Sequence, residues 1–439
     1  MSKSLIIRQA TVVSSKDSFV ADVLIRNNKF EKIEPSISHT AGEEIDARGL
    51  HLIPGVLDPQ VHFREPGMTW KEDLETGSKA AASGGVTSFF EMPNTSPATI
   101  NAEAIKAKKD LAKEKSLVNF NFFIGATPYN IDELNSVSNV CGIKIFMGSS
   151  TGDLLVHDSS DLERIFSNGT RLIAVHAEDE ERLRQNTEKY AGTKDVADHM
   201  KIRDVETAVL ATRKAISLSH RFQRRLHILH MTTGDEVDIL ATAKHLAPIT
   251  AEVCVQHFLL HAPEVYKKLG TLAQMNPPLR EESHGKKLWK ALQDGLIDCI
   301  ATDHAPHTLE EKDQPYGKAP SGMPGVETSL PLMLNRANQG LCSLQDVVKW
   351  MCENPVKIYN VENKGYILPH YDADFVLVDM KKTKTIQNGS LHTKVNWSPY
   401  NGWETQGWPV MTFVNGNLVF REGDFFTDKK GKEVKIKNG

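Results

Sequence analysis

The chain has 439 residues, a net charge of −4 and 25% charged residues, which is ordinary for a soluble protein with one large domain and a smaller one. No basic run suggests binding to nucleic acid or to a membrane surface, and no segment approaches the roughly 20 apolar residues of a membrane span. The composition therefore predicts a small molecule as the partner, with a homodimer left open.

The two ends of the chain share short apolar runs separated by turn signals, a pattern typical of antiparallel strands. Near the N-terminus the run 18–25 is closed by Asn27 and Asn28, and near the C-terminus the run 410–420 contains an Asn-Gly hairpin signal. We expect residues 1–52 and 365–439 to build one small β-sandwich domain.

Between the two ends, apolar runs alternate with helical stretches, which predicts a (β/α)8 barrel over residues 53–364. A doubly wound open sheet is the alternative, but it concentrates its site at one switch point. Here polar residues follow several apolar runs, which favours the barrel. Helices are expected over 76–83, 102–115, 179–190, 205–219 and 282–293, and strands over 86–92 and 120–124.

The candidate site residues stand at or near the ends of these apolar runs. Gln60, His62 and Arg64 alternate in the first run, so a strand would point them the same way. Imidazole together with carboxylate is the ligand set of zinc in hydrolases. His227 lies three residues before His230 and is expected to face the opposite side of its strand, so we give it a structural role. The later members of the set are His176, His230 and Asp303.

Lys144 stands inside the apolar run 143–147, where a charged amine is costly. A lysine paired with a carboxylate is the ordinary structural explanation. Burial, however, lowers the pKa of a lysine, and the free amine can add carbon dioxide to give an anionic carbamate. Two oxygens on one anion can bridge two cations, so Lys144 is a candidate metal ligand.

The five cysteines are odd in number and scattered, so they predict neither a disulfide framework nor a zinc ribbon. A reducing compartment, the cytoplasm, is expected. The apolar run at the N-terminus is too short for a signal peptide.

On its motifs the chain resembles the dihydroorotase family, within the cyclic amidohydrolase superfamily of metal-dependent barrels. The matching motifs run in the family's order from about residue 50 to 330, and the terminal β segments match in character alone. The motifs are D-P-Q-V-H-F-R-E-P-G at 58–67, M-P-N-T at 92–95, H-A-E-D at 176–179, N-P-P-L-R at 276–280, A-T-D-H-A-P-H at 301–307 and K-A-P-S-G-M-P-G-V-E-T at 318–328.

The resemblance implies reversible cyclisation of N-carbamoyl-L-aspartate to dihydroorotate in pyrimidine biosynthesis, by a metal-activated hydroxide with Asp303 as general acid and base. It implies one or two zinc ions, bridged by carboxylated Lys144. The implied metal ligands are His62, Lys144, His176, His230 and Asp303. The implied substrate-binding residues are Arg64, Asn94, Asn276, His307 and the backbone near Gly322.

Two positions depart from the family pattern or leave it open. Gln60 replaces the first histidine of the family's H-x-H, so we expect it to be a weak ligand or to turn towards a hydrogen-bond partner. Asp153 is a second candidate for the bridge, although Lys144 is favoured because it lies within the apolar run. Whether residues 305–325 close over the substrate as a lid is left open.

Two other functions compete with this interpretation. One is another cyclic-amide hydrolase, an allantoinase or a hydantoinase/dihydropyrimidinase, whose substrates lack the ring carboxylate that Arg64 would bind. The other is a catalytically silent homologue, which Gln60 alone supports.

Overall fold

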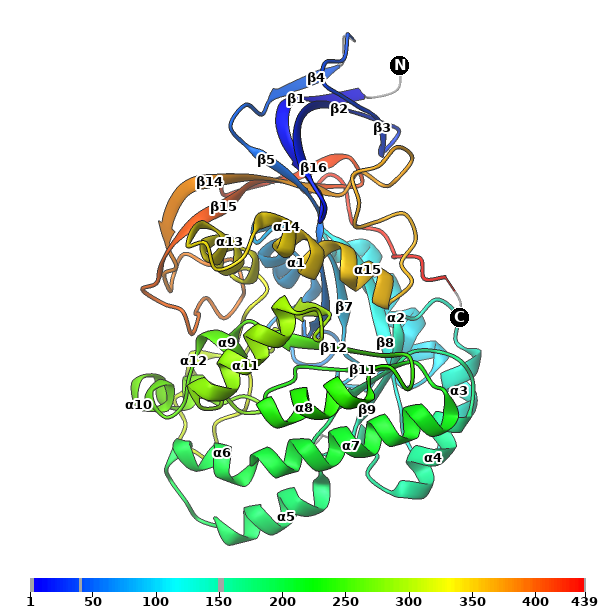
Figure 1. The fold of residues 1–439 in the computed structure, drawn as a ribbon, viewed down its shortest axis with the longest axis vertical. Helices are drawn as coiled ribbons and strands as arrows, with labels where there is room; N and C mark the ends of the chain where they lie inside the picture. The colour runs from blue at the N-terminus through cyan, green and yellow to red at the C-terminus, as the bar shows by residue number, and fades with distance from the viewer. Residues whose placement is uncertain (1–3, 39–41, 149–153, 438–439) are drawn as a thin grey trace.

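The computed structural model describes residues 4–38, 42–148 and 154–437. A β domain lies at one end of the molecule and a barrel with its helices at the other (Figure 1). Within the described ranges no helix is both long and apolar enough to cross a membrane. The alternative bridging residue, Asp153, falls outside the described residues.

The barrel is an eight-stranded parallel sheet whose strands follow one another in chain order. Val61 forms a parallel bridge with His304, and the His62 N–H donates to the His304 carbonyl at 2.8 Å, which joins the first strand to the last. This closure confirms the predicted barrel, because a doubly wound sheet would reverse its strand order and leave two edges. The strands are β6 (Val56–Val61), β7 (Val86–Glu91), β8 (Asn119–Gly125), β9 (Gly142–Phe146), β10 (Ile173–His176), β11 (Leu226–Ile228), β12 (Ile249–Cys254) and β13 (Cys299–Ala301).

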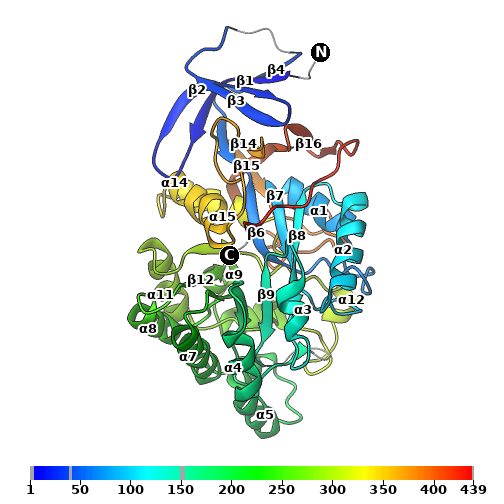
Figure 2. The same cartoon turned by 90° about the vertical axis from the view of Figure 1, so that its right-hand side faces the viewer.

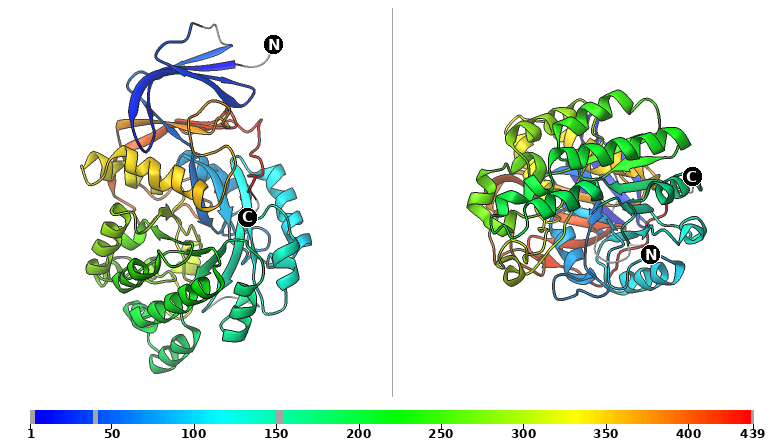
Figure 3. Two further views of the ribbon diagram at one scale, coloured as in Figure 1. Left: turned by 45° about the vertical axis from the view of Figure 1, so that its right-hand side comes forward. Right: turned by 90° about the horizontal axis from the view of Figure 1, so that it is seen from below.

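Helices surround these strands, as the view from below shows (Figure 3). The predicted helices are present within a few residues, and side-chain caps explain several of their starts: Asp204 accepts from the Thr207 N–H, and Thr233 with Glu236 forms a capping box. The α-helices are α1 (Leu74–Ser83), α2 (Ala102–Lys115), α3 (Ile131–Ser136), α4 (Ser159–Ser167), α5 (Glu180–Lys189), α6 (His199–Ile202), α7 (Val205–Phe222), α8 (Gly234–Ala243), α9 (Gln256–Leu259), α10 (Glu264–Leu269), α11 (Glu282–Gln293), α12 (Leu309–Lys312), α13 (Ser329–Asn338), α14 (Leu344–Val348) and α15 (Asn354–Ile358). Two 3₁₀ helices, η2 (Val196–Asp198) and η3 (Gly270–Ala273), and one π-helical segment, η4 (Lys349–Glu353), complete the set in the described residues.

The β domain is built from both ends of the chain, as expected. Its strands lie along one path, β17-β16-β15-β14-β5-β1-β2-β3, with β4 added beside β1. The pairs of β1 with β4 and with β5 are parallel, which the expectation of antiparallel strands did not include. The strands are β1 (Ser4–Val13), β2 (Ser18–Arg26), β3 (Lys29–Glu34), β4 (Glu43–Asp46), β5 (His51–Pro54), β14 (Phe375–Thr385), β15 (Glu404–Val414), β16 (Asn417–Arg421) and β17 (Asp424–Phe425).

One apolar core joins the two terminal halves of this domain. It contains Ile7 and Val23 from the N-terminal strands and Phe375 and Phe413 from the C-terminal ones. The predicted Asn-Gly hairpin connects β15 to β16, with φ of 50° at Asn415 and 70° at Gly416. Positive φ at both central residues matches the twist of the flanking strands, which is why this dipeptide is favoured there.

The C-terminal part of the chain also reaches the barrel. The N–H of Val434 donates to the carbonyl of Phe120 at 2.8 Å, so the last described residues run beside β8. Figure 2 shows the last described residues beside the barrel and away from strand β1. At the opposite end of the barrel, Trp397 Nε1 donates to the His307 carbonyl at 2.8 Å.

The barrel interior is filled from one end by apolar side chains. They form a cluster that includes Phe90, Phe123, Leu229 and Tyr359. The filling stops near the carboxyl ends of the strands, where active sites of this fold are found.

Candidate functional site

Each predicted metal-binding or substrate-binding residue that the structure describes lines a single cavity of about 350 Å³. The cavity lies at the carboxyl ends of β6, β7, β9, β10, β11 and β13, together with the loops that follow the later strands. The barrel therefore brings together residues that lie far apart in the sequence. The residues are Gln60, His62, Arg64, Asn94, Lys144, His176, His230, Asn276, Asp303, His307 and Gly322.

His62 and Asp303 face each other with no hydrogen to share. His62 Nδ1 lies 2.8 Å from Asn94 Oδ1, so this nitrogen carries the proton and donates it. The other nitrogen, Nε2, then presents a lone pair 3.1 Å from Asp303 Oδ1. Two acceptors at this distance repel each other unless a cation or a proton lies between them. Burial lowers the pKa of His62, which disfavours the proton, so the geometry fits a metal ion.

Gln60 has turned towards Asp303. Its Nε2 donates to Asp303 Oδ1 at 3.0 Å, while its Oε1 is buried without a hydrogen-bond partner among the described residues. A buried acceptor without a partner costs free energy, and in a native structure it calls for a ligand or an ordered water. The amide nitrogen of Gln60 is therefore bound to the carboxylate, and its oxygen is left for a ligand.

His176 and His230 form the second pair of candidate metal ligands. His176 Nε2 donates to Glu178 Oε2 at 2.7 Å, which leaves a lone pair on its Nδ1, 3.1 Å from His230 Nε2. Arg203 pairs with the same Glu178 carboxylate and holds its pKa down to about 2. A carboxylate behind a histidine is typical of metal sites, because it fixes the ring and its tautomer. Glu178 was missed in the sequence as a functional residue, although it stands in the H-A-E-D motif.

His230 leaves a buried nitrogen unsatisfied in either tautomer. Its Nδ1 has no partner among the described residues, and burial, with the nearby His176, Lys144 and His257 charges, holds its pKa well below the ordinary value. A neutral ring with an orphaned lone pair is the form that binds metals.

Lys144 lies in β9 with 1% of its surface exposed. No carboxylate within the described ranges forms an ion pair with it, and its Nζ stands 4.5 Å from the centre of the Phe146 ring. Burial lowers its pKa to about 7. Lys108 is an instructive contrast, because it is equally buried and pairs with Glu91 at 2.9 Å. The structural explanation considered for Lys144, a carboxylate partner, applies to Lys108 instead.

The prediction that His227 and His230 face opposite sides of the strand is wrong. β11 ends at Ile228, and His230 has a φ of 34°, so the strand alternation does not extend to it. His227 packs 5.5 Å from the Tyr359 ring inside the barrel, and His230 lines the cavity above.

Like His230, Arg64 and Asp303 have left-handed backbones, with φ of 63° and 47°. Such strain costs about 1–3 kcal/mol per residue and gathers at functional sites.

His227, Glu252 and Cys299 form a separate buried cluster whose ligand atoms lie within 4.8 Å of one another. Both nitrogens of His227 already have partners, Thr250 Oγ1 at 2.8 Å and Glu252 Oε2 at 2.9 Å. The ring is therefore saturated by hydrogen bonds, which suits the structural role expected for it.

The opposite side of the cavity is cationic. Arg64 is 6% exposed; its Nε donates to the Pro306 carbonyl at 3.2 Å, and one terminal nitrogen lies 3.1 Å from His307 Nε2. Lys71 also lines the cavity, and Lys312 lies close enough to His307 to lower its pKa. We call Arg64, Lys71 and Lys312, which surround the His307 ring, the cationic wall. The two lysines were missed in the sequence, where nothing distinguished them from surface lysines.

The segment from 305 to 325 is tied down at several points. The Lys312 ammonium donates to the carbonyls of Gln274, Pro320 and Gly322, each at 2.9 Å. The Gly322 N–H donates to the Gln274 carbonyl at 2.9 Å, so both backbone groups of Gly322 have partners within the protein. Its φ is 139°, and a Cβ would lie 2.4 Å from the Ala305 carbonyl oxygen. Glycine is required there so that the loop can lie against the cavity.

Asn276 enters the cavity from the loop after η3. Its Oδ1 accepts a hydrogen bond from His199 Nε2 at 3.0 Å, and the same nitrogen lies 2.9 Å from the Met275 carbonyl. His199 therefore supports a predicted site residue, and no sequence pattern pointed to it.

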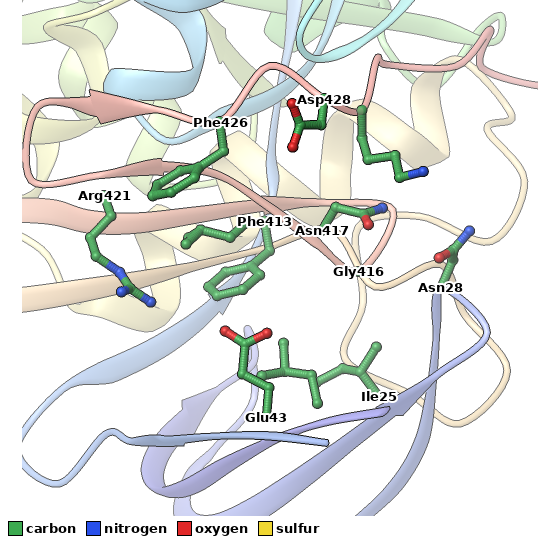
Figure 4. Close-up of a pocket in the computed structure, with 12 residues that line it drawn as sticks. Ile25, Asn28, Glu43, Phe413, Gly416, Asn417, Arg421, Phe426 and Asp428 are labelled. Carbon is green, nitrogen blue, oxygen red and sulfur yellow. The ribbon is translucent and has the colours of Figure 1, made fainter. Parts of the chain in front are cut away.

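A second cavity of about 320 Å³ lies in the β domain (Figure 4). Its walls come from both terminal halves and include Phe413, Phe426 and Ile25, with Glu43 and Arg421. No imidazole or thiol lines it within the described part of the chain, so it offers neither an imidazole base nor a soft metal ligand.

The comparisons with known proteins agree with the barrel site. The model of the amidohydrolase family matches residues 51–419. The chain is 35% identical to a dihydroorotase of Methanosarcina acetivorans, over 94% of this chain and 91% of that protein. It is 34% identical to a dihydroorotase of Pyrococcus furiosus, over 94% and 92%.

Solved structures of cyclic amidohydrolases superpose on nearly the whole chain. An L-hydantoinase (dihydropyrimidinase) from Arthrobacter aurescens has a TM-score of 0.94 and 29% identity, covering 98% of this chain and 99% of that one. A dihydropyrimidinase from Brevibacillus agri has a TM-score of 0.92 and 29% identity, covering 99% of each chain. With a closed barrel, a histidine-rich cavity at its carboxyl end and these matches, the chain belongs to the amidohydrolase family, whose members are generally metal-dependent hydrolases.

Proposed function

We propose that this chain is a dihydroorotase, which interconverts dihydroorotate and N-carbamoyl-L-aspartate in pyrimidine biosynthesis. The observation that carries the proposal is the cationic wall: Arg64 and Lys71 line the cavity, and Arg64, Lys71 and Lys312 all lie close enough to His307 to lower its pKa. Dihydroorotate has a ring carboxylate to place there, and the guanidinium of Arg64 suits a carboxylate. Hydantoins and dihydropyrimidines lack that group. The curated relatives at 34–35% identity, named dihydroorotases, support the same choice.

The nitrogen and oxygen atoms with free lone pairs opposite the cationic wall fit divalent cations, for which we propose zinc. His176 and His230 would hold one ion, and His62 with Asp303 the other, while a carbamate on Lys144 would bridge them. Bound zinc lowers the pKa of water and polarises a carbonyl group. Burial lowers the pKa of Lys144 to about 7, so more of its amine is unprotonated and able to form the carbamate.

The chain's own residues would then divide the remaining work. Asp303 lies among the candidate metal ligands, so its carboxylate can take a proton from the attacking water and pass it to the leaving amide nitrogen. Arg64 would fix the ring carboxylate, with Asn276 and His307 beside it. Hydrolysis of the ring amide creates a carboxylate and releases a proton, so ring closure consumes one. Synthesis should therefore gain at acid pH and hydrolysis at alkaline pH.

The compartment proposed is the cytoplasm. All five cysteines are free thiols, which suits a reducing environment.

The test is an assay of ring opening on dihydroorotate, dihydrouracil, hydantoin and allantoin, with metal content measured on the same sample. We expect dihydroorotate to be strongly preferred and zinc to be bound. Equal rates on dihydrouracil and dihydroorotate would instead indicate a broad cyclic-amide hydrolase, the function named for the structural neighbours. Zinc binding without turnover of any of the four would indicate a silent homologue.

A further inference from the structure

Lys71 lies between β6 and α1, and its side chain is 10% exposed. Its Nζ lies 2.9 Å from His307 Nδ1 and 3.1 Å from Glu311 Oε1. The lysine also lines the cavity, so it connects the surface carboxylate of Glu311 to the imidazole beside Arg64.

The contact with Lys71 sets the tautomer of His307. A lysine ammonium can donate hydrogen bonds but cannot accept them, so His307 Nδ1 must present its lone pair to Lys71. The ring is neutral, because burial and the charges of Arg64, Lys71 and Lys312 hold its pKa far below the ordinary value. The proton therefore sits on Nε2, where the Ser321 carbonyl accepts it at 3.0 Å.

This tautomer has a consequence for Arg64. One terminal nitrogen of Arg64 lies 3.1 Å from His307 Nε2, but Nε2 already carries a hydrogen and cannot accept another. Among the described residues, no carbonyl or carboxylate takes a hydrogen bond from either terminal nitrogen of Arg64. The guanidinium therefore keeps its outer donors for a ligand. The opposite tautomer would let His307 accept from Arg64 and use up one of these donors.

We propose that Lys71 is a positioning residue for carboxylate recognition: by holding His307 in its Nε2–H tautomer, it keeps the outer nitrogens of Arg64 available for the substrate. The proposal rests on the proposed function. It adds a residue that acts through His307, without contact to the reacting atoms.

The first experiment measures kcat and KM for dihydroorotate in Lys71→Met. A positioning role in binding should raise KM by about tenfold or more and leave kcat within about twofold. Lys71→Arg keeps a permanent donor and should recover most of the loss. Lys109→Met is the matched control, because Lys109 is 12% exposed and pairs with Glu433 at 2.8 Å away from the cavity. A KM unchanged in Lys71→Met, as in the control, would overturn the proposal.

A double-mutant cycle tests whether Lys71 acts through His307. In the His307→Gln background, adding Lys71→Met should cost much less than it does in the natural chain. Full additivity would mean that Lys71 contacts the substrate directly, and the positioning role would be lost.

A spectroscopic measurement needs no turnover and so separates this proposal from the proposed function. In ¹⁵N-histidine-labelled protein, the resonances missing from His307→Gln identify His307. We expect an unprotonated Nδ1 and a protonated Nε2 in the natural chain, and a shift towards the other tautomer in Lys71→Met. If the natural chain shows this tautomer but does not open dihydroorotate, the proposed function fails while the control of His307 by Lys71 stands. The same tautomer in both proteins would refute that control.

Discussion

The two sides of the cavity are unsatisfied in opposite senses. On one side, His62 Nε2 faces Asp303 Oδ1 at 3.1 Å, two acceptors without a hydrogen between them. On the other side, the outer nitrogens of Arg64 have no carbonyl or carboxylate acceptor among the described residues. The first arrangement needs a cation and the second needs an anion. A cavity that places both needs within one volume of about 350 Å³ is prepared for metal ions and an anionic substrate together.

Saturated pairs elsewhere in the barrel show that this is not the general condition of its buried polar groups. Lys108 pairs with Glu91 at 2.9 Å, and His227 has a partner on each nitrogen. Buried polar groups are normally satisfied, so the groups that are not satisfied mark the site.

The largest effect is expected from removing the carboxylate on the metal side. Asp303→Asn should lower turnover by at least about 10²-fold, because the amide cannot accept a proton and is a poorer metal ligand. The measurement is kcat, together with thermal unfolding to show that the protein is folded. Asp294→Asn, at the exposed end of α11, is the matched control. Near-parental turnover in Asp303→Asn would move the base elsewhere, with His307 the first residue to examine.

On the cationic side, Arg64→Ala should lower kcat/KM for dihydroorotate by roughly 10- to 100-fold, since a charge-assisted hydrogen bond is worth about 1.5–3 kcal/mol. Metal content should stay unchanged, which separates the two sides. Arg64→Lys should recover activity only in part, because an ammonium cannot make a bidentate contact. Full activity in the alanine variant would contradict the assignment of Arg64.

The pKa of Lys144 predicts how the metal side is assembled. A pKa of about 7 leaves most of the amine protonated at pH 6 and most of it free at pH 8. Only the free amine adds carbon dioxide, so reactivation of metal-stripped protein by zinc at fixed dissolved carbon dioxide should be about tenfold faster at pH 8 than at pH 6. The rate of recovered activity measures this. A rate independent of carbon dioxide would argue against the carbamate.

The smallest effect concerns the inequality of the two metal positions. Gln60 offers one neutral amide oxygen in place of an imidazole, so the ion beside His62 should be held more weakly than the ion of His176 and His230. After dialysis against a weak chelator we expect about one zinc per chain, rising towards two in Gln60→His. Two equally firm equivalents in the natural chain, unchanged by the substitution, would falsify this inequality.

Much of the site could be predicted from the sequence because barrel strands carry their functional residues at one end. His62, His176 and Asp303 follow apolar runs, and closure of the sheet had to bring those ends together. The supporting residues could not be predicted in the same way. Arg203, Lys71 and His199 act through contacts with residues distant in sequence, and nothing in their own surroundings distinguishes them from surface groups. Glu178 stands two residues after His176, but its contact with that ring depends on how the loop after the strand folds.

The sequence by itself determined the order of strands and helices, the barrel, the β domain built from both ends, the candidate metal ligands, and Arg64 among the cations at the cavity. Those features follow from local periodicity and from residue types at strand ends. The tertiary structure decided the surroundings of each group: which atoms face the two nitrogens of His307, that Gln60 turns to Asp303, that Lys144 has no carboxylate partner among the described residues while Lys108 has one, and that His230 turns into the cavity. Each of these features depends on a partner atom from another strand or loop and on the removal of water from around the group. Neither the partner atom nor the removal of water is determined by a single segment of the sequence.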